Sequence, residues 1–227
     1  MDEAAARVAQ VRARIAAACA RAGRDPAEVV LVGVSKRQPV ARIQAVVEAG
    51  VAILGESRVQ EAEAKAPRLS GVRELHLVGR LQRNKARRAV ALFHLIHSVD
   101  REPLLEAIAR AAGAAGRRQR ILLQVNVGRE PQKGGCEPEA AGRLLAAAEA
   151  LPEVAVEGLM AVPPYHPDPE AARPHFRAMG RLAAELEQRL GRPLRLSLGM
   201  SRDLEVAVEE GAHWVRVGTA LFGPREG

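Results

Sequence analysis

The amino-acid sequence predicts an α/β fold, a (β/α)₈ barrel of the TIM type with an extra N-terminal helix, in one domain over residues 1–227. Eight short apolar segments alternate with longer segments in which apolar residues recur at helical spacing. The apolar segments are almost continuously hydrophobic, which is typical of parallel strands that are buried on both faces. Eight strand and helix units in a chain of this length favour a closed barrel.

Each predicted strand is one of the apolar segments, and each predicted helix is one of the longer segments between them. The strands are expected at residues 29–34, 51–55, 74–79, 93–99, 120–127, 154–161, 195–198 and 213–217. The helices between them are expected at residues 39–49, 58–66, 82–92, 102–114, 138–150, 169–190 and 203–210, and a further helix over residues 4–21 precedes the first strand. The Pro-rich residues 163–167 follow the sixth strand, where we expect a long loop on the ligand-binding face rather than a domain boundary.

A doubly wound open sheet is the alternative architecture. The dinucleotide-binding form of that sheet carries a G-x-G-x-x-G motif after its first strand. The corresponding turn in this chain reads Ser35-Lys36-Arg37-Gln38-Pro39, and no linker-like segment divides the chain. The barrel is therefore the predicted fold.

The composition narrows the classes of partner. The formal net charge is +7 and the isoelectric point is about 10.3, which fits a nucleic acid, an anionic small ligand or an arginine-rich proteome. Aromatic residues make up 2% of the chain, which argues against a protein that stacks single-stranded bases. The densest basic run, from Arg80 to Arg88, is expected to be a solvated helix face, with an acidic partner as the alternative. We expect neither a nucleic-acid nor a membrane partner.

The sequence carries no targeting signal. Cys19 and Cys136 lie far apart and offer neither a disulfide framework nor metal-ligand spacing, which fits a reducing compartment. The start of the chain is acidic, with Asp2 and Glu3 before a helical pattern, and therefore differs from a signal peptide. No apolar run is long enough to span a bilayer. We expect a cytoplasmic protein.

Lys36 is the first candidate for chemistry. The chain has 34 basic residues, and the only lysines among them are Lys36, Lys65, Lys85 and Lys133. An ammonium group can lose its proton when it is desolvated and can then attack a carbonyl, whereas a guanidinium cannot. A primary amine at the end of a buried strand, in a chain that otherwise uses arginine, therefore suggests a Schiff base. The alternative is a solvated lysine just past a strand.

Two loops predict a phosphate site. In barrels of this type, ligands bind at the carboxyl ends of the strands, and phosphate often binds in the loops after strands seven and eight. These loops are residues 199–203 and 218–223, and each places glycine or hydroxyl-bearing residues at the start of a helical turn. Backbone N–H groups, together with the hydroxyls of Ser201 and Thr219, would bind a phosphate dianion. The alternative is that Ser201 is only a helix cap and Gly218 only a turn glycine.

Polar residues also interrupt the predicted strands. Arg216 lies within the last strand, and because an unpaired buried charge is costly, it must meet an anion, an acceptor or a ligand. A structural salt bridge is the alternative. Asn126 is a comparable polar residue at the end of the fifth strand. His94 and His97 lie three apart in one strand and would point to opposite faces, so we predict no histidine metal site, and no Ser–His–Asp arrangement is present.

Eight short segments carry a resemblance to a known family. They are Val34-Ser35-Lys36, Leu54-Gly55-Glu56, residues 76–85 (HLVGRLQRNK), Gln124-Val125-Asn126, Lys133-Gly134-Gly135, Gly158-Leu159-Met160, residues 197–201 (SLGMS) and residues 215–223 (VRVGTALFG). In this order, over nearly the whole chain, they resemble the pyridoxal phosphate homeostasis protein family, single-domain relatives of the alanine racemase barrel. One position departs from the pattern, because Ser57 stands where the family usually has Asn.

The resemblance implies that the chain binds pyridoxal 5′-phosphate (PLP) as a Schiff base with Lys36. An arginine at the pyridine nitrogen would make the ring a weaker electron sink than a carboxylate would, so little catalysis is expected. The residues that the resemblance places around the cofactor are Ser201, Gly218 and Thr219 at the phosphate, Arg216 at the pyridine nitrogen, and Met200 and Asn126 near the ring.

Three functions remain open from the sequence. The first is a PLP-binding protein that acts in vitamin B6 homeostasis and supplies apoenzymes, with little or no turnover. The second is a small PLP-dependent amino-acid racemase with Lys36 as one base, although the single tyrosine, Tyr165, lies in a Pro-rich loop. The third is a phosphate-binding barrel without PLP, or a basic protein that binds nucleic acid. We expect the first, a protein that is not an enzyme, and a monomer because a closed barrel exposes no sheet edge.

Overall fold

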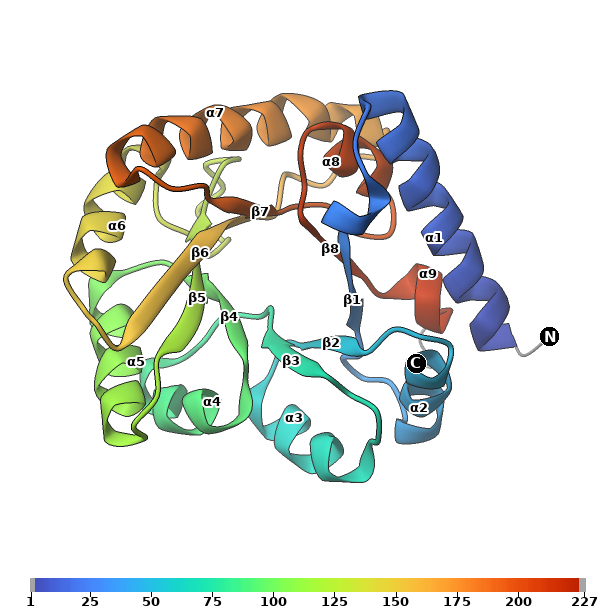
Figure 1. Cartoon of the computed structure of the whole chain (residues 1–227), viewed down its shortest axis with the longest axis horizontal. Coiled ribbons are helices and arrows are strands. Elements are labelled where there is room, and N and C mark those ends of the chain that lie inside the picture. Colours follow the sequence, from blue (N-terminus) through green and yellow to red (C-terminus); the bar gives the residue numbers. More distant parts are fainter. Residues whose placement is uncertain (1–2, 225–227) are drawn as a thin grey trace.

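The computed structural model describes residues 3–224 as a closed barrel of eight parallel strands with helices around it (Figure 1). Neighbouring strands pair in sequence order, and β8 pairs with β1 to close the barrel. The strands are β1 (Val30–Val34), β2 (Ile53–Glu56), β3 (Glu74–Leu77), β4 (Leu95–Val99), β5 (Gln119–Val125), β6 (Val154–Ala161), β7 (Arg195–Ser197) and β8 (Trp214–Val217). The predicted (β/α)₈ barrel is confirmed, and the open sheet is excluded.

The predicted helices are present, with changes at their first turns. The helices are α1 (Glu3–Ala22), α2 (Val40–Glu48), α3 (Val59–Lys65), α4 (Ala86–Leu92), α5 (Glu102–Ala114), α6 (Ala141–Glu149), α7 (Arg173–Leu190), α8 (Leu204–Glu209) and α9 (Thr219–Phe222). Asp2 lies outside the described residues. Short 3₁₀ turns precede α4, α6 and α7. α9 is the helical turn that the sequence analysis placed at residues 218–223, and its four residues are too few to show a helical period.

Several apolar runs continue beyond the strands that they form. Val78 and Val162 follow β3 and β6 directly, and both line the cavity described below. The Val78 amide still donates to the Glu56 carbonyl of β2 at 2.9 Å. The backbone of Asn126, just after β5, donates a hydrogen bond to the carbonyl of Cys136 and so turns into a loop. The third, fifth and seventh predicted strands were too long at their carboxyl ends, because the ligand-binding face of the barrel is itself partly apolar.

The hydrophobic core has two parts. The larger part lies between strands and helices and includes Leu54 and Phe93. Side chains alternate between the two faces along each strand, so Ile53, next to Leu54 in β2, points into the barrel. The second cluster fills that interior and consists of Val32, Ile53, Leu95, Leu122, Met160 and Trp214.

Helix α1 lies beside α8 and α9, next to the last strands of the barrel (Figure 1). Arg14 of α1 pairs with Glu205 of α8, with 2.5 Å between Nε and Oε1. The first helix is thereby attached to the carboxyl-terminal part of the chain. No helix within residues 3–224 is both long and apolar enough to cross a membrane.

The basic run from Arg80 to Arg88 is mostly solvated, but only part of it is helical. Arg80 and Arg83 are exposed in the segment before α4, whereas Arg87 and Arg88 are exposed on α4. Arg88 forms an ion pair with Glu63 of α3. The expected helix face is thus a loop followed by a helix.

Candidate functional site

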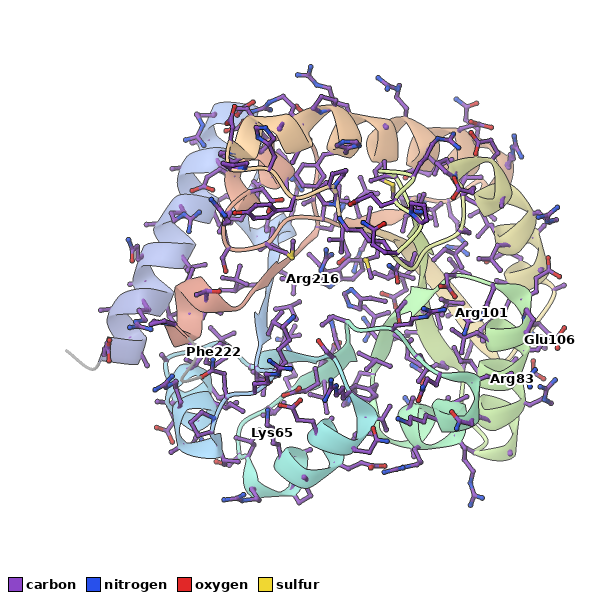
Figure 2. All side chains as sticks on the ribbon, turned by 180° about the vertical axis from the view of Figure 1, so that it is seen from behind. Lys65, Arg83, Arg101, Glu106, Arg216 and Phe222 are labelled. Carbon is purple, nitrogen blue, oxygen red and sulfur yellow. The ribbon has the colours of Figure 1, made fainter. Side chains whose placement is uncertain are left out.

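A cavity of about 530 Å³ opens at the carboxyl ends of the strands, the face on which such barrels bind their ligands. Six of the seven predicted site residues line this cavity, namely Lys36, Met200, Ser201, Arg216, Gly218 and Thr219. Figure 2 shows Arg216 near the middle of the barrel. The fold therefore brings together residues that lie as far as 183 positions apart in the sequence.

Lys36 lies in a tight turn that follows β1. The turn is closed by a hydrogen bond of 3.1 Å from the Gln38 amide to the Ser35 carbonyl, and Arg37 has a φ of 58°. A non-glycine residue in this left-handed region is uncommon and persists only where the surroundings hold it. Here the Arg37 amide donates to Glu61 Oε1 at 2.5 Å. The backbone on the carboxyl side of Lys36 is therefore fixed by a neighbouring helix.

A buried ion cluster holds the other side of the turn. The Ser35 hydroxyl donates to Glu56 Oε1 at 2.7 Å, and Lys65 Nζ donates to the Ser35 carbonyl at 2.8 Å. Lys65 also contacts Glu56 at 3.1 Å and Glu61 at 2.6 Å. Burial raises the pKa of Glu56, while the Ser35 hydroxyl and the Lys65 charge act against that rise. Figure 2 labels Lys65, on α3. We name Glu56, Glu61 and Lys65 the turn clamp.

Ser201 joins the loops after β7 and β8. Its hydroxyl oxygen accepts hydrogen bonds from the amides of Gly218 and Ala220, each at 3.3 Å. It is not the cap of α8, whose N-cap residue is Asp203. The two loops thus place a hydroxyl and two backbone amides beside one another at the cavity, and these are the kinds of group that bind phosphate.

Two residues that the sequence did not single out support this cluster. Arg14 Nη2 donates to the Ser201 carbonyl at 3.0 Å, and Asp203 Oδ1 accepts from the Met200 amide at 2.6 Å. Burial raises the pKa of Asp203, and the hydrogen bond from the Met200 amide opposes this. Gly199 between the strand and the loop has a φ of 82°, and a Cβ there would lie 2.5 Å from the Ala207 side chain. The loop therefore needs glycine at this position.

Arg216 is a buried cation in the cavity wall. Its side chain is 4% exposed, and it donates from Nη1 to Ser197 Oγ at 2.5 Å and from Nη2 to the Ala161 carbonyl at 2.9 Å. Burial lowers the pKa of Arg216 to about 10, with the charge of Asp203 opposing, so the group stays protonated at neutral pH. No carboxylate of residues 3–224 forms a salt bridge with it. The predicted alternative, a structural salt bridge, is therefore not found in that part of the chain.

Asn126 is the predicted site residue that the structure places elsewhere. Its Nδ2 donates to the Glu130 carbonyl and its Oδ1 accepts from the Glu130 amide, both at 3.1 Å. Both ends of the side-chain amide are thus used within the loop that leads to Lys133, and Asn126 is not among the residues that line the cavity. Its contact with a cofactor ring stays a prediction.

The mouth of the cavity carries further polar groups. Lys133 Nζ donates to the Pro163 carbonyl at 2.8 Å and pairs with Glu130. Tyr165 is 74% exposed, and the guanidinium of Arg202 stacks on its ring at 5.0 Å. Ser57, where the sequence is expected to depart from the family pattern, also lines the cavity. The substitution therefore falls on a cavity-lining position.

The described residues contain no cluster of His, Cys, Asp and Glu side chains that could hold a metal ion. His94 precedes β4, is exposed and accepts from the Leu75 amide, whereas His97 lies in β4 and is fully buried, so the two were wrongly predicted to share one strand. Cys19 and Cys136 are both free thiols. The donor set thus consists of an amine, a buried guanidinium, and a group of amides and hydroxyls, which suits a phosphate ester that also carries an aldehyde.

Comparison with known proteins gives consistent matches. The family model described as the alanine racemase N-terminal domain matches residues 7–226. The pyridoxal phosphate homeostasis protein of Aquifex aeolicus is 44% identical over 97% of this chain and 97% of its own length, and that of Pseudomonas aeruginosa is 41% identical over 100% and 97%. The structure of PipY from Synechococcus elongatus with PLP bound superposes with a TM-score of 0.86 at 39% identity, covering 97% of this chain and 100% of PipY.

Proposed function

Because the chain belongs to the pyridoxal phosphate homeostasis protein family, within the family of the alanine racemase N-terminal domain, we propose that it holds PLP as a Schiff base with Lys36 and serves vitamin B6 homeostasis. The observation that carries this proposal is the meeting of Lys36, Arg216 and Ser201 in one cavity. PLP is bound in the PipY structure, which supports the same ligand here. Bound PLP would supply an aldehyde that condenses reversibly with an amine.

Each part of the cavity has a separate task in this proposal. Lys36 provides the amine, and the turn clamp fixes its backbone without using its side chain. Ser201 and the amides that it contacts bind the phosphate. Val34, Val78 and Val162 line the cavity, and their apolar side chains would help to exclude water from bound PLP.

Arg216 is expected to limit the reactions that bound PLP can promote. A guanidinium has only donors, so at the pyridine nitrogen Arg216 would donate a hydrogen bond and could not supply a carboxylate that keeps the nitrogen protonated. Transamination and decarboxylation, which depend on that proton, should therefore be slow. This property suits a protein that stores the cofactor and passes it to apoenzymes.

The racemase alternative needs a second proton-transfer group besides Lys36, and the tyrosine of the chain is not held in a desolvated position. Tyr165 is the only tyrosine in the chain, and it is exposed at the cavity mouth. A catalytic base has to lie within hydrogen-bond reach of the proton that it abstracts. The homeostasis role is therefore the better supported proposal. We place the protein in the cytoplasm on the ground that both cysteines are free thiols.

Hydride trapping tests the proposed function directly. The purified protein is mixed with PLP, reduced with borohydride and analysed by intact mass and peptide mapping. We expect one adduct per chain, on Lys36, because this amine lies in the cavity on a fixed turn. The absence of any adduct on Lys36 in the presence of excess PLP would contradict the proposal.

Ser201→Ala provides a graded test of the phosphate site. Loss of the hydroxyl is expected to weaken PLP binding by about 1 kcal/mol, the usual contribution of one hydrogen bond, while the amides of the two loops remain. The dissociation constant can be measured from the visible absorption of the loaded protein. Thr219→Val, which removes a hydroxyl from the exposed side of the same wall, is the matched comparison. An unchanged dissociation constant for Ser201→Ala would assign phosphate binding to the amides alone.

A further inference from the structure

A chain of hydrogen bonds crosses the interior of the barrel, from Arg216 at the cavity to Glu74 at the start of β3. Arg216 Nη1 lies 2.5 Å from Ser197 Oγ, and Ser197 Oγ lies 3.0 Å from His97 Nδ1. His97 Nε2 lies 3.0 Å from His76 Nδ1, and His76 Nε2 lies 2.9 Å from Glu74 Oε2. In Figure 1, β7 and β8 lie across the barrel from β3 and β4, so these contacts span its width.

The middle of this chain is closed to water. Ser197, His97 and His76 are each 0% exposed, so their polar atoms must be satisfied by protein groups. At the far end, Glu74 Oε2 also accepts from Arg120 Nη1 at 2.9 Å. The hydrogen bond from His76 is the main cause that lowers the pKa of Glu74 to about 2, and the charge of Arg120 adds to it. The series of hydrogen bonds thus runs from the guanidinium of Arg216 to the carboxylate of Glu74.

The two ends together determine where each proton lies. Arg216 can only donate, so Ser197 Oγ accepts and its own proton is free to go to His97 Nδ1. Burial keeps His97 neutral, because it lowers the pKa of that imidazole well below the usual value. His97 then carries its proton on Nε2 and donates to His76 Nδ1.

The contacts at Glu74 lead independently to the same direction of the hydrogen bonds. Glu74 is ionised and can only accept, so His76 must carry its proton on Nε2. Burial lowers the pKa of His76, which leaves Nδ1 as an acceptor for His97. Every donor in the series then points in one direction, from the guanidinium to the carboxylate. Hydrogen bonds aligned in this way polarise one another, and the effect is stronger in a low-dielectric interior.

We propose that Ser197, His97, His76 and Glu74 are positioning residues that hold Arg216 in place through this series of hydrogen bonds. The inference rests on the proposed PLP site, where Arg216 faces the pyridine nitrogen. A carboxylate in direct contact with Arg216 would also lie near that nitrogen and could keep it protonated. The group that Arg216 Nη1 contacts is instead the neutral Ser197 hydroxyl, and the carboxylate of the series, Glu74, lies at its far end.

The first test determines which nitrogen of each buried histidine carries the proton in the PLP-free protein. Long-range ¹H–¹⁵N spectra of protein labelled in histidine distinguish an imidazole nitrogen that carries a proton from one that accepts. We expect His97 and His76 both to carry the proton on Nε2 at neutral pH, with Nδ1 as acceptor. A proton on Nδ1 of either ring, or a doubly protonated ring, would overturn the directed chain. This result does not depend on PLP, so it stands apart from the outcome of hydride trapping on Lys36.

The second test asks whether the chain acts on the cofactor. Ser197→Ala is expected to raise the PLP dissociation constant about tenfold, the effect of one lost hydrogen bond to a charged group, and to shift the visible absorption band. Ser98→Ala is the matched control, because Ser98 is a buried hydroxyl on the same barrel whose Oγ has no hydrogen-bond partner among the described residues. It should change neither quantity.

A third variant interrupts the hydrogen bonds farther from the cavity. His76→Leu breaks the series of hydrogen bonds beyond Ser197 and His97. It should shift the absorption band in the same direction as Ser197→Ala, by a smaller amount. Thermal unfolding of each variant identifies any that fails to fold, in which case the remaining variant decides. If the folded variants match Ser98→Ala in both band position and affinity, the positioning role is wrong.

Discussion

Lys36→Ala is expected to abolish the visible absorption of the PLP-loaded protein and leave the barrel folded. The variant removes the amine that forms the imine bond, so PLP would be held only by its phosphate and ring contacts. The side chain of Lys36 lines the cavity and does not belong to either core cluster. The turn around it is held through Ser35 and Arg37, whose contacts do not involve the lysine amine. Absorption spectra and thermal unfolding measure the two expectations.

Lys133→Arg is the matched control for Lys36→Ala, because Lys133 is the other lysine that lines the cavity. Arginine keeps the positive charge and can still donate to the Pro163 carbonyl, but it forms no stable imine. This variant should retain the full visible band and the borohydride adduct. The opposite pattern, with the band lost in Lys133→Arg and kept in Lys36→Ala, would move the covalent bond to position 133.

Arg216→Glu is the second variant with a large expected effect. A carboxylate at this position would hold a proton on the pyridine nitrogen, and the absorption band should therefore shift. PLP affinity should fall by tenfold or more, because the change replaces a donor by an acid and leaves the Ala161 carbonyl without its hydrogen bond. Stability should fall by about 3 kcal/mol, in the range for a broken buried charge contact.

Arg216→Met separates the loss of the guanidinium from the gain of the acid. Methionine is of similar length and uncharged, so it should lower affinity without producing the spectrum of a protonated ring. Incubation with single enantiomers of amino acids adds a chemical readout: the wild-type protein should show no sustained turnover, and only the glutamate variant should gain slow exchange or transamination. If Arg216→Glu retained both the wild-type spectrum and the wild-type affinity, Arg216 would not face the ring.

The fold was predictable because each barrel element depends on local pattern. β6 has the bounds predicted from the sequence, Val154–Ala161, since a long apolar run there is bordered by clear breaks. β2 begins at Ile53, two residues after the predicted start, although Val51 before it is also buried. Burial and strand pairing are separate properties, and the sequence pattern reports mainly the first.

The site was predictable where one residue type was unusual for its position. A lysine after a buried strand, an arginine inside a strand, and glycine with hydroxyl residues after the last two strands all stand out in the sequence, and the structure brings them to one cavity. Arg14 could not be recognised in this way. It is one of several arginines on α1, and only the packing of α1 beside α8 brings it to the Ser201 carbonyl.

The chain of groups behind Arg216 was even less accessible to sequence analysis. His76 and His97 come from different strands, and their contact depends on the pairing of β3 with β4, in which His76 aligns with Leu95. Ser197 joins them from across the barrel. Nothing in a single sequence reports a register between strands, so a hydrogen-bond series of this kind emerges only from the three-dimensional arrangement.

The turn clamp has a consequence for a protein that carries a reactive aldehyde. Lys65 is one of four lysines in the chain, and its amine is engaged with Glu56, Glu61 and the Ser35 carbonyl. Lys133 is likewise held at the cavity mouth. The surface obtains its positive charge almost entirely from guanidinium groups, which do not condense stably with aldehydes. Stray adducts at other positions should therefore be few, and the stoichiometry of loading should stay close to one cofactor per chain even when the aldehyde is in excess.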